Sequence, residues 1–272
     1  MPLSTRHHAS HDVFLLRDGL FEAPPDVVLR SRAATPGGEE RAAPDGLGHT
    51  VLQLPVNCFL LRGPTGLSLV DAGCGSAWGA GFGGARAALA RLGVVPEAIE
   101  RVLLTHLHSD HVLGLFEGDS AYFPQAEIWV PRAELAFFSD AAERARLPPA
   151  RQGGFELAAR LERHCAQRLR PLGPGPVLPG IEALPLPGHT PGHCGYRLGD
   201  LLLWGDALHL AELQPGDPDI GMAFDLDPAG AAATRHTLLR RCAAEGWVVA
   251  GAHIEGFRRV SSAGGAWKLA PA

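Results

Sequence analysis

The sequence predicts an α/β protein in which two β-sheets pack face to face and helices cover their outer faces. Three observations favour this fold class. Apolar, β-rich segments occur in both halves of the chain, hairpins and isolated strands precede the helical segments, and His or Asp follows several of the predicted strands. A doubly wound parallel sheet would need a regular alternation of strands and helices, which this chain lacks.

The core of the first half begins with a predicted hairpin. Residues 51–61 are apolar and rich in β-formers, residues 63–66 form a turn, and residues 67–70 lead into Asp71-Ala72-Gly73. The other predicted elements of this half are a helix at 85–92, a strand at 101–105, a strand at 127–130, a helix at 132–138 and a longer helix at 155–168.

Short strands followed by loops characterise the second half. Glycine and proline break the chain at 171–180. The predicted elements after this break are strands at 181–186, 196–198 and 201–204, a helix at 228–245 and a strand at 247–250. Because the loops after these strands carry His or Asp, we expect functional side chains at the strand ends.

The domain prediction is one domain over residues 1–272, with an N-terminal arm at 1–48 and a core at 49–272. The arm is rich in Pro, Gly, Arg and Ala, and it contains two weak strand-like segments at 13–16 and 27–29. Its histidines, His7, His8 and His11, could form a metal-binding tail, but a solvated terminus explains them better.

Composition and charge exclude several classes of function. A chain of 272 residues that is 46% apolar can bury a substantial core. Its net charge of -5, with acidic and basic residues interspersed, provides no basic patch for nucleic acid or an anionic membrane. The sequence also lacks the apolar run of a membrane span and the apolar core of a secretory signal, so we expect a soluble, cytoplasmic protein.

The five cysteines do not indicate a disulfide framework. They are odd in number, scattered, and never arranged as Cys-x-x-Cys. Cys74 and Cys194 lie near the motifs that follow, but we interpret them as small buried thiols and exclude them from the metal ligands.

The segment Thr105-His106-Leu107-His108-Ser109-Asp110-His111 carries the strongest chemical signal. It places four residues of metal-ligating type in six positions directly after a predicted strand. Residues two apart on an extended chain point the same way, so His106 and His108 can share one metal while Asp110 and His111 turn toward a second. Such crowded groups need an organising cation, and the segment therefore predicts a metal centre.

Three further candidate ligands follow later strands. His189 lies in Gly188-His189-Thr190-Pro191-Gly192-His193, Asp206 in Trp204-Gly205-Asp206, and His253 in Ala250-Gly251-Ala252-His253. The neighbouring glycines let the backbone bend sharply, which a site assembled from several loop tips requires. We therefore predict a site of seven ligands from distant parts of the chain.

These motifs, spread over residues 51–253, resemble those of the metallo-β-lactamase superfamily. The resemblance implies a four-layer sandwich of two mixed β-sheets packed face to face, with helices on both outer faces. It also implies two divalent metal ions, one held by His106, His108 and His189, the other by Asp110, His111 and His253, with Asp206 bridging both. Zinc is the expected ion at an imidazole-rich site, although manganese, iron or cobalt could also bind.

The same resemblance assigns supporting roles to residues beside the ligands. Asp71 matches an aspartate that orients ligand histidines, with a turn cap as the alternative. Thr190 and His193 match positions that brace a loop. One departure is that Leu113 replaces the first of two glycines common in the family, and only Gly114 remains. We expect altered packing under the site and no lost ligand.

Within the superfamily, the segments 123–127, 205–212, 224–227 and 231–235 resemble the branch of methyl parathion hydrolases and of relatives that hydrolyse lactones and aryl esters. His209 stands where lactonases carry a tyrosine, so it is a candidate electrophile or proton donor, with a buried structural histidine as the alternative. By the same resemblance, Trp78, Phe138, Met222 and Phe224 line an apolar substrate pocket together with His209, although aromatic residues are as often part of the core.

The expected activity is hydrolysis of a small lactone or aryl ester by a hydroxide that bridges the two metals, with Asp110 accepting a proton as the intermediate collapses.

Alternatives are hydrolysis of organophosphate triesters and a thioesterase like glyoxalase II, whose basic helical substrate-binding domain we do not expect here. A true β-lactamase usually carries Arg at the place of His111 and Cys at that of Asp206. Diiron oxygen reductases tend to carry a carboxylate at the place of His108. A metal-binding protein without turnover is the non-enzymatic alternative, and a homodimer is a further expectation.

Overall fold

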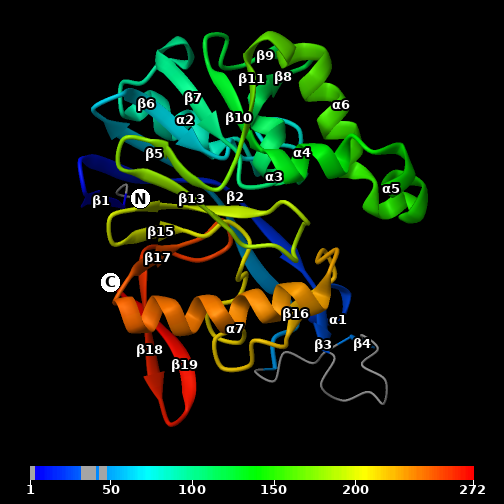
Figure 1. Cartoon of the computed structure of the whole chain (residues 1–272), viewed down its shortest axis with the longest axis vertical. Helices are drawn as coiled ribbons and strands as arrows, with labels where there is room; N and C mark the ends of the chain where they lie inside the picture. Colours follow the sequence, from blue (N-terminus) through cyan, green and yellow to red (C-terminus); the bar gives the residue numbers. More distant parts are fainter. Residues whose placement is uncertain (1–3, 32–40, 43–47) are drawn as a thin grey trace.

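The computed structural model describes residues 4–31, 41, 42 and 48–272. Its main elements form four layers, in which two mixed β-sheets pack face to face between two outer layers of helices (Figure 1). The fold class predicted from the sequence is therefore confirmed.

Among the described residues, the first sheet has seven strands in the order β1-β2-β5-β6-β7-β10-β11. The strands are β1 (Thr5–His8), β2 (His11–Ala23), β5 (Leu52–Gly63), β6 (Gly66–Val70), β7 (Ile99–Leu103), β10 (Glu127–Pro131) and β11 (Leu169–Leu172). The pairs from β1 to β6 are antiparallel, and those from β6 to β11 are parallel.

The second sheet, over the same described residues, also has seven strands, in the order β12-β13-β14-β15-β17-β18-β19. The strands are β12 (Gly175–Leu178), β13 (Ile181–Pro185), β14 (Cys194–Leu198), β15 (Leu201–Leu203), β17 (Val248–Ala250), β18 (Arg258–Ala263) and β19 (Ala266–Pro271). The β15–β17 pair is parallel and the other pairs are antiparallel. Smaller sheets join β16 (Gly221–Met222), β3 (Leu29–Ser31) and β4 (Arg41–Ala42), and β8 (Phe116–Glu117) with β9 (Ser120–Ala121).

The larger helices cover the two outer faces of the sandwich. In Figure 1, α2, α3, α4 and α6 lie beside the first sheet and α7 runs along the second. The helices are α1 (Pro25–Val28), α2 (Gly84–Arg91), α3 (Ser109–Val112), α4 (Arg132–Phe138), α5 (Ala141–Arg146), α6 (Gly153–Cys165) and α7 (Pro228–Glu245), with short 3-10 helices η1 (Pro96–Ala98), η2 (Leu113–Leu115), η3 (Pro149–Arg151) and η4 (Ala166–Arg168). None of the helices in the described residues combines the length and the apolar character needed to cross a membrane.

The apolar core fills all three spaces between the layers. On β7, Leu103 packs between the sheets with Tyr196, while its neighbour Val102 packs on the helical side with Leu161 of α6. Val249 of β17 belongs to the cluster that includes α7. Successive residues of a strand face opposite sides, so a strand covered on both faces is apolar throughout. This explains why the strands near the site are short apolar runs.

Strand β2 corrects the prediction of an N-terminal arm. Residues 11–23 form a long sheet strand paired along β5, whereas the sequence indicates only a short strand at 13–16. A register shift between Arg17 and Gly19 turns the polar Asp18 inward, where it is buried, and thereby hides the alternation in the sequence. His8 and His11 are buried, so the solvated-terminus interpretation is wrong for these two histidines. Residues 32–40 and 43–47 of the predicted arm lie outside the described residues.

Candidate metal centre

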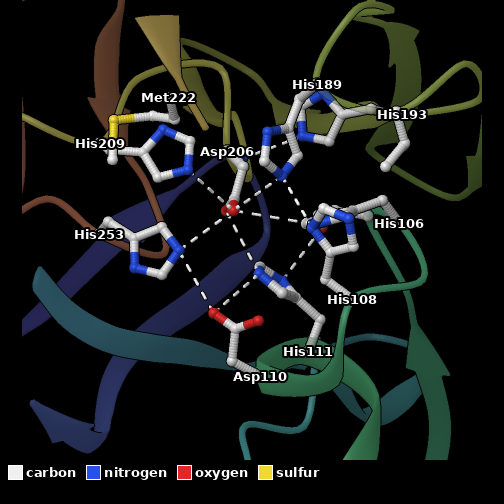
Figure 2. Close-up of polar contacts among 12 residues, drawn as sticks. His106, His108, Asp110, His111, His189, His193, Asp206, His209, Met222 and His253 are labelled. Atoms are coloured by element: carbon white, nitrogen blue, oxygen red, sulfur yellow. Dashed lines mark hydrogen bonds and ion pairs between the residues drawn. The ribbon is translucent and has the colours of Figure 1, made fainter. Parts of the chain in front are cut away.

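Loops from four strand ends meet at one edge of the two sheets. The predicted ligands come from the segment after β7 and the start of α3 (His106, His108, Asp110, His111), from the loop after β13 (His189), from the loop after β15 (Asp206) and from the loop after β17 (His253). Figure 2 shows these side chains pointing toward one another, with Asp206 at the centre. The structure therefore brings all seven predicted ligands together.

A first group consists of His106, His108, His189 and Asp206, whose ligand atoms all lie within 4.8 Å of one another. His108 Nδ1 is 3.0 Å from His189 Nε2. Asp206 Oδ2 is 3.3 Å from His189 Nε2 and 3.8 Å from His106 Nε2. Three imidazoles and one carboxylate thus surround a single point.

A second group consists of Asp110, His111 and His253. Asp110 Oδ2 lies 3.4 Å from His253 Nε2 and 3.6 Å from His111 Nε2. Asp206 also faces this group, since its Oδ1 is 3.3 Å from His111 Nε2 and its Oδ2 is 3.1 Å from His253 Nε2. The Asp206 carboxylate therefore lies between the two groups.

The chemistry of these groups fits divalent cations. His106 Nε2, His111 Nε2 and Asp206 Oδ1 are buried and have no hydrogen-bond partner among the described residues. Buried polar atoms are normally paired, so unpaired atoms that converge on one place indicate a ligand. Imidazole nitrogens with carboxylate oxygens are typical of zinc and related ions. The residues thus fit one cation in each group.

The pKa shifts of the proposed ligands are of two kinds, since those of His106, His108 and Asp206 are lowered and those of His111, His189 and His253 are raised. Burial and the neighbouring imidazoles lower the pKa of His106 and His108 well below the ordinary value, which leaves their ring nitrogens unprotonated. Burial would raise the pKa of Asp206, but the surrounding histidines, His253 and His111 foremost, hold it well below the ordinary value. Burial opposes charge on His189 as well, yet the carboxylates of Asp206 and Asp225 raise its pKa to about 9. A cation would replace that proton.

Asp71 holds His111 in place, as the sequence predicts. Its Oδ2 is 2.8 Å from His111 Nδ1 and accepts the Thr105 hydroxyl at 2.9 Å, while its Oδ1 accepts the Thr105 backbone N–H at 2.8 Å. Asp71 has a positive φ of 58°, a conformation that aspartate tolerates better than most residues. The Nδ1 bond leaves His111 Nε2 directed at the metal centre.

Asp225 does the same for His189, and sequence reasoning missed it. Asp225 is fully buried, with Oδ1 2.8 Å from His189 Nδ1. Its Oδ2 accepts the Met222 backbone N–H at 3.1 Å and Arg235 Nη1 at 3.3 Å. His189 and Arg235 stand 36 and 10 residues away in the chain, so no local spacing identifies this aspartate.

Glu134 is a second residue that the sequence did not reveal. This fully buried carboxylate on α4 accepts Leu107 N at 2.9 Å, Thr190 Oγ1 at 2.8 Å and Gly192 N at 2.8 Å. It thereby joins the loop of His106 and His108 to the loop of His189. Burial raises the pKa of Glu134 to about 7, against the lowering effect of its three donors.

His193 braces the same loops. Its Nδ1 is 2.8 Å from the carbonyl oxygen of Leu186, and its Nε2 accepts the Asp206 backbone N–H at 3.0 Å. Together with the Thr190 hydroxyl bond, these contacts suit the bracing role expected for His193 and Thr190.

His209 lies beside the predicted ligands. Its Nε2 is 3.2 Å from Asp206 Oδ2, and its ring is nearly parallel to that of His253, with centroids 4.8 Å apart and planes 10° apart. Burial, as the largest effect, lowers the pKa of His209 to about 4 and keeps the imidazole neutral. With Asp206 and His253 it forms a further group of metal-ligating type, which the sequence did not suggest.

A cavity of about 560 Å³ opens onto the metal centre. Ligands and His209 form its floor, and its apolar walls are Phe21, Leu54, Trp78, Leu113, Leu157, Phe224 and Leu226. Trp78 and Phe224 therefore line the cavity as predicted. Phe21 comes from β2 and was not expected there. Leu113, which replaces a family glycine, contributes a side chain to the cavity wall.

Two predicted pocket residues lie elsewhere. Phe138 is buried in the core beside the first sheet, where its ring packs on Phe155 with centroids 5.1 Å apart. Met222 is fully buried in a cluster with Leu29 and Leu54. Neither residue is among the described residues that line the cavity. These two assignments are wrong because tertiary packing, and not side-chain type, decides which apolar groups face the cavity.

The fold and the site together define a protein class. The family model of the metallo-beta-lactamase superfamily matches residues 51–253, and the chain belongs to this superfamily. Its cluster of His and Asp side chains gives this member of the superfamily a candidate metal site.

Individual proteins are similar to this chain in sequence or in fold. The uncharacterized protein YobT of Bacillus subtilis (strain 168) is 30% identical over 161 residues, which cover 57% of this chain and 63% of that protein, less than two thirds of its length. The crystal structure of the hydrolase AbOPH in the beta-lactamase superfamily is 26% identical, covers 99% of this chain and 97% of its own, and has a TM-score of 0.84. AidC, described as a dizinc quorum-quenching lactonase with a bound product, is 20% identical with the same coverage and a TM-score of 0.85, which shows a shared fold.

Proposed function

We propose that this protein hydrolyses neutral lactones or aryl esters at a dinuclear metal centre. The observation that carries the proposal is that five of the seven proposed ligands, His108, Asp110, His189, Asp206 and His253, line a cavity with largely apolar walls. Its volume lies in the range of small-molecule sites. The fold is similar to that of a dizinc lactonase, and this similarity supports a lactone as the substrate.

The proposed ligands divide as the geometry suggests. His106, His108 and His189 would hold one cation, Asp110, His111 and His253 the other, and Asp206 both. When bound, the two cations supply Lewis acidity for the substrate oxygen and generate the attacking hydroxide from water. Zinc is the ion we propose, with manganese, iron and cobalt as possible replacements.

Two residues of the chain are proposed to act on the substrate or on protons. Asp110 adjoins the cavity and would take the proton that the attacking oxygen loses and pass it to the leaving oxygen as the C–O bond breaks. His209 also adjoins the cavity as a neutral imidazole, and its Nε2 would donate a hydrogen bond to the substrate oxygen. Preorganised donors of this kind stabilise the negative charge that develops on the substrate oxygen.

The cavity wall favours a neutral substrate. Its apolar side chains cannot offset the desolvation of a highly charged group. The charged side chains Arg151, Arg160 and Glu156 line the cavity as well, and each has a partner in the protein: Arg151 donates to the backbone carbonyls of Ala223 and Asp225, Arg160 donates to that of Gly118, and Glu156 lies 3.6 Å from Arg144. A neutral organophosphate triester meets the same criterion and is the second candidate.

The proposal is tested by assaying the purified, metal-loaded protein with an aryl lactone, an aryl ester, an organophosphate triester and a glutathione thioester, while its metal content is measured. We expect turnover of the lactone or the aryl ester and about two metal ions per chain. His108→Ala should lose metal and turnover together. His236→Ala is the matched control, because this histidine is exposed and pairs with Asp219 away from the cavity.

Two outcomes would contradict the proposal. Strong thioester hydrolysis without lactone or ester turnover would assign the protein to the thioesterase alternative. A fully metal-loaded protein that leaves all four substrates intact would overturn hydrolysis of ester-like bonds altogether. Selective turnover of the triester would favour the second candidate.

A further inference from the structure

Arg151 lines the cavity without contacting a predicted ligand, and its hydrogen bonds indicate a separate role. At the end of η3, its guanidinium donates from Nη1 to the Asp225 carbonyl and from Nη2 to the Ala223 carbonyl, both at 3.0 Å. The residue between these carbonyls is Phe224, which lines the cavity and is 39% exposed. Arg151 therefore bridges the backbone on both sides of a cavity-wall residue.

The turn at residues 223–225 is also held on its inner side. Ala223 N donates to Val28 O at 2.7 Å, and Asp225 N donates to Met222 O at 3.0 Å. The Asp225 side chain binds His189 and Arg235. Arg151 adds two hydrogen bonds from the cavity side. Loss of these two bonds would loosen the turn on that side and leave the contact between Asp225 and His189 in place.

Phe224 belongs to an aromatic wall. Its ring centroid is 6.5 Å from that of Phe21, which in turn is 5.8 Å from that of Trp78. All three side chains line the cavity. The position of Phe224 consequently affects the space available to the part of a substrate that extends away from the metals.

We propose that Arg151 is a positioning residue that sets selectivity for bulky substrates by clamping the turn at 223–225. This inference rests on the proposed hydrolysis of esters or lactones. The planar guanidinium can donate hydrogen bonds to two carbonyls at once, whereas the ammonium group of lysine cannot donate to both in the same geometry. Without the clamp, a substrate that reaches Phe224 loses packing, and a small substrate at the metal centre does not.

The kinetic test compares Arg151→Lys and Arg151→Met with the wild type, using 4-nitrophenyl acetate and 4-nitrophenyl octanoate. We expect the KM for the octanoate to rise about tenfold, with kcat, the KM for the acetate and the metal content changed less than about twofold. Arg168→Met is the matched control. Arg168 also donates to two backbone carbonyls, those of Phe123 at 3.0 Å and Ala126 at 2.6 Å, but it is not among the described residues that line the cavity, so its loss should leave the selectivity unchanged.

Hydrogen exchange gives a readout that does not depend on turnover. Backbone amides in residues 223–226 should exchange about tenfold faster in both Arg151 variants than in the wild type and in Arg168→Met. If Arg151→Met does not fold, the lysine variant still supplies both measurements. Unchanged exchange, equal rises in KM for both esters, or loss of metal would overturn the role of Arg151. If the wild type turned over no ester, the proposed function would be overturned instead. The hydrogen-exchange rates of residues 223–226 would then decide alone whether Arg151 holds this turn in place.

Discussion

Asp225 supports a proposed metal ligand on one side and a buried cation on the other, and Asp225→Asn separates these roles. The carboxylate binds His189 through Oδ1 and Arg235 through Oδ2, and both Asp225 and Arg235 are almost fully buried. Asparagine keeps one oxygen for the His189 ring but places an NH2 group where the Met222 N–H and Arg235 need an acceptor. The variant thus keeps one contact and loses the charge.

Asp71→Asn is the matched variant. Asp71 lies at the same 2.8 Å distance from a ligand histidine, but its other hydrogen bonds come from Thr105 and not from a buried cation. Both substitutions should weaken metal binding by about 10- to 100-fold, because each alters the residue that orients a ligand. Their effects on the metal-free protein should differ.

The difference follows from the buried charge. Removing one partner of a buried ion pair costs about 3–5 kcal/mol, and Arg235 retains a 2.8 Å bond from Nε to Pro218 O, so we expect about 3 kcal/mol for Asp225→Asn. Asp71→Asn leaves a donor without its acceptor, which costs about 1–2 kcal/mol. Urea unfolding of the metal-free proteins measures both values, and competition with a chromogenic chelator measures metal affinity.

Arg235→Met completes a double-mutant cycle. In Asp225→Asn/Arg235→Met the buried cation is gone, so the double variant should be more stable than the sum of the single effects predicts by about 2 kcal/mol. Its metal affinity should stay as low as that of Asp225→Asn. A coupling below about 0.5 kcal/mol, or equal destabilisation by the Asp71 and Asp225 variants, would refute the reasoning.

Further predictions concern packing and metal. Gly192→Ala should destabilise the protein by more than about 2 kcal/mol in a thermal unfolding assay, because the added Cβ would lie 2.0 Å from the backbone N of Glu134. Gly153→Ala is the control and should be neutral or slightly stabilising, because its Cβ would have no neighbour within 4 Å. Leu16→Ala should lower the free energy of unfolding by about 2–5 kcal/mol, because this side chain of β2 is fully buried. Leu20→Ala on the same strand should lower it by less than about 1 kcal/mol, because Leu20 is 39% exposed, and similar losses for both variants would contradict the placement of β2. Chelator treatment should lower Tm by about 8 °C for each bound ion, hence about 16 °C for two, at a metal concentration 1,000-fold above Kd, and an unchanged Tm would argue against metal at this site.

The group of seven proposed metal ligands was predictable because the sequence pattern that identifies each of them is local. Four of them lie within six positions, and each of the other three follows a short apolar strand and stands near glycine, so the chain itself displays the motif. Glu134 and Asp225 differ because their partners are remote in sequence and nothing near them marks a buried carboxylate. Strand β2 was underestimated for a related reason, since the register shift after Arg17 breaks the alternation that identifies strands.

The cavity wall shows most directly why pocket residues need the tertiary structure. Phe138 can pack inward on α6 because residue 154 is glycine: a Cβ there would lie 2.3 Å from the Phe138 ring. Phe21 faces the cavity from a strand whose register shift is not visible in the sequence, and Gly19 on that strand makes room for Phe82, which packs on Trp78 at 5.2 Å. In both cases a glycine leaves room for an aromatic ring that packs behind the cavity wall. We therefore predict that substitutions at such positions change the selectivity of the proposed hydrolysis while all seven proposed ligands stay the same.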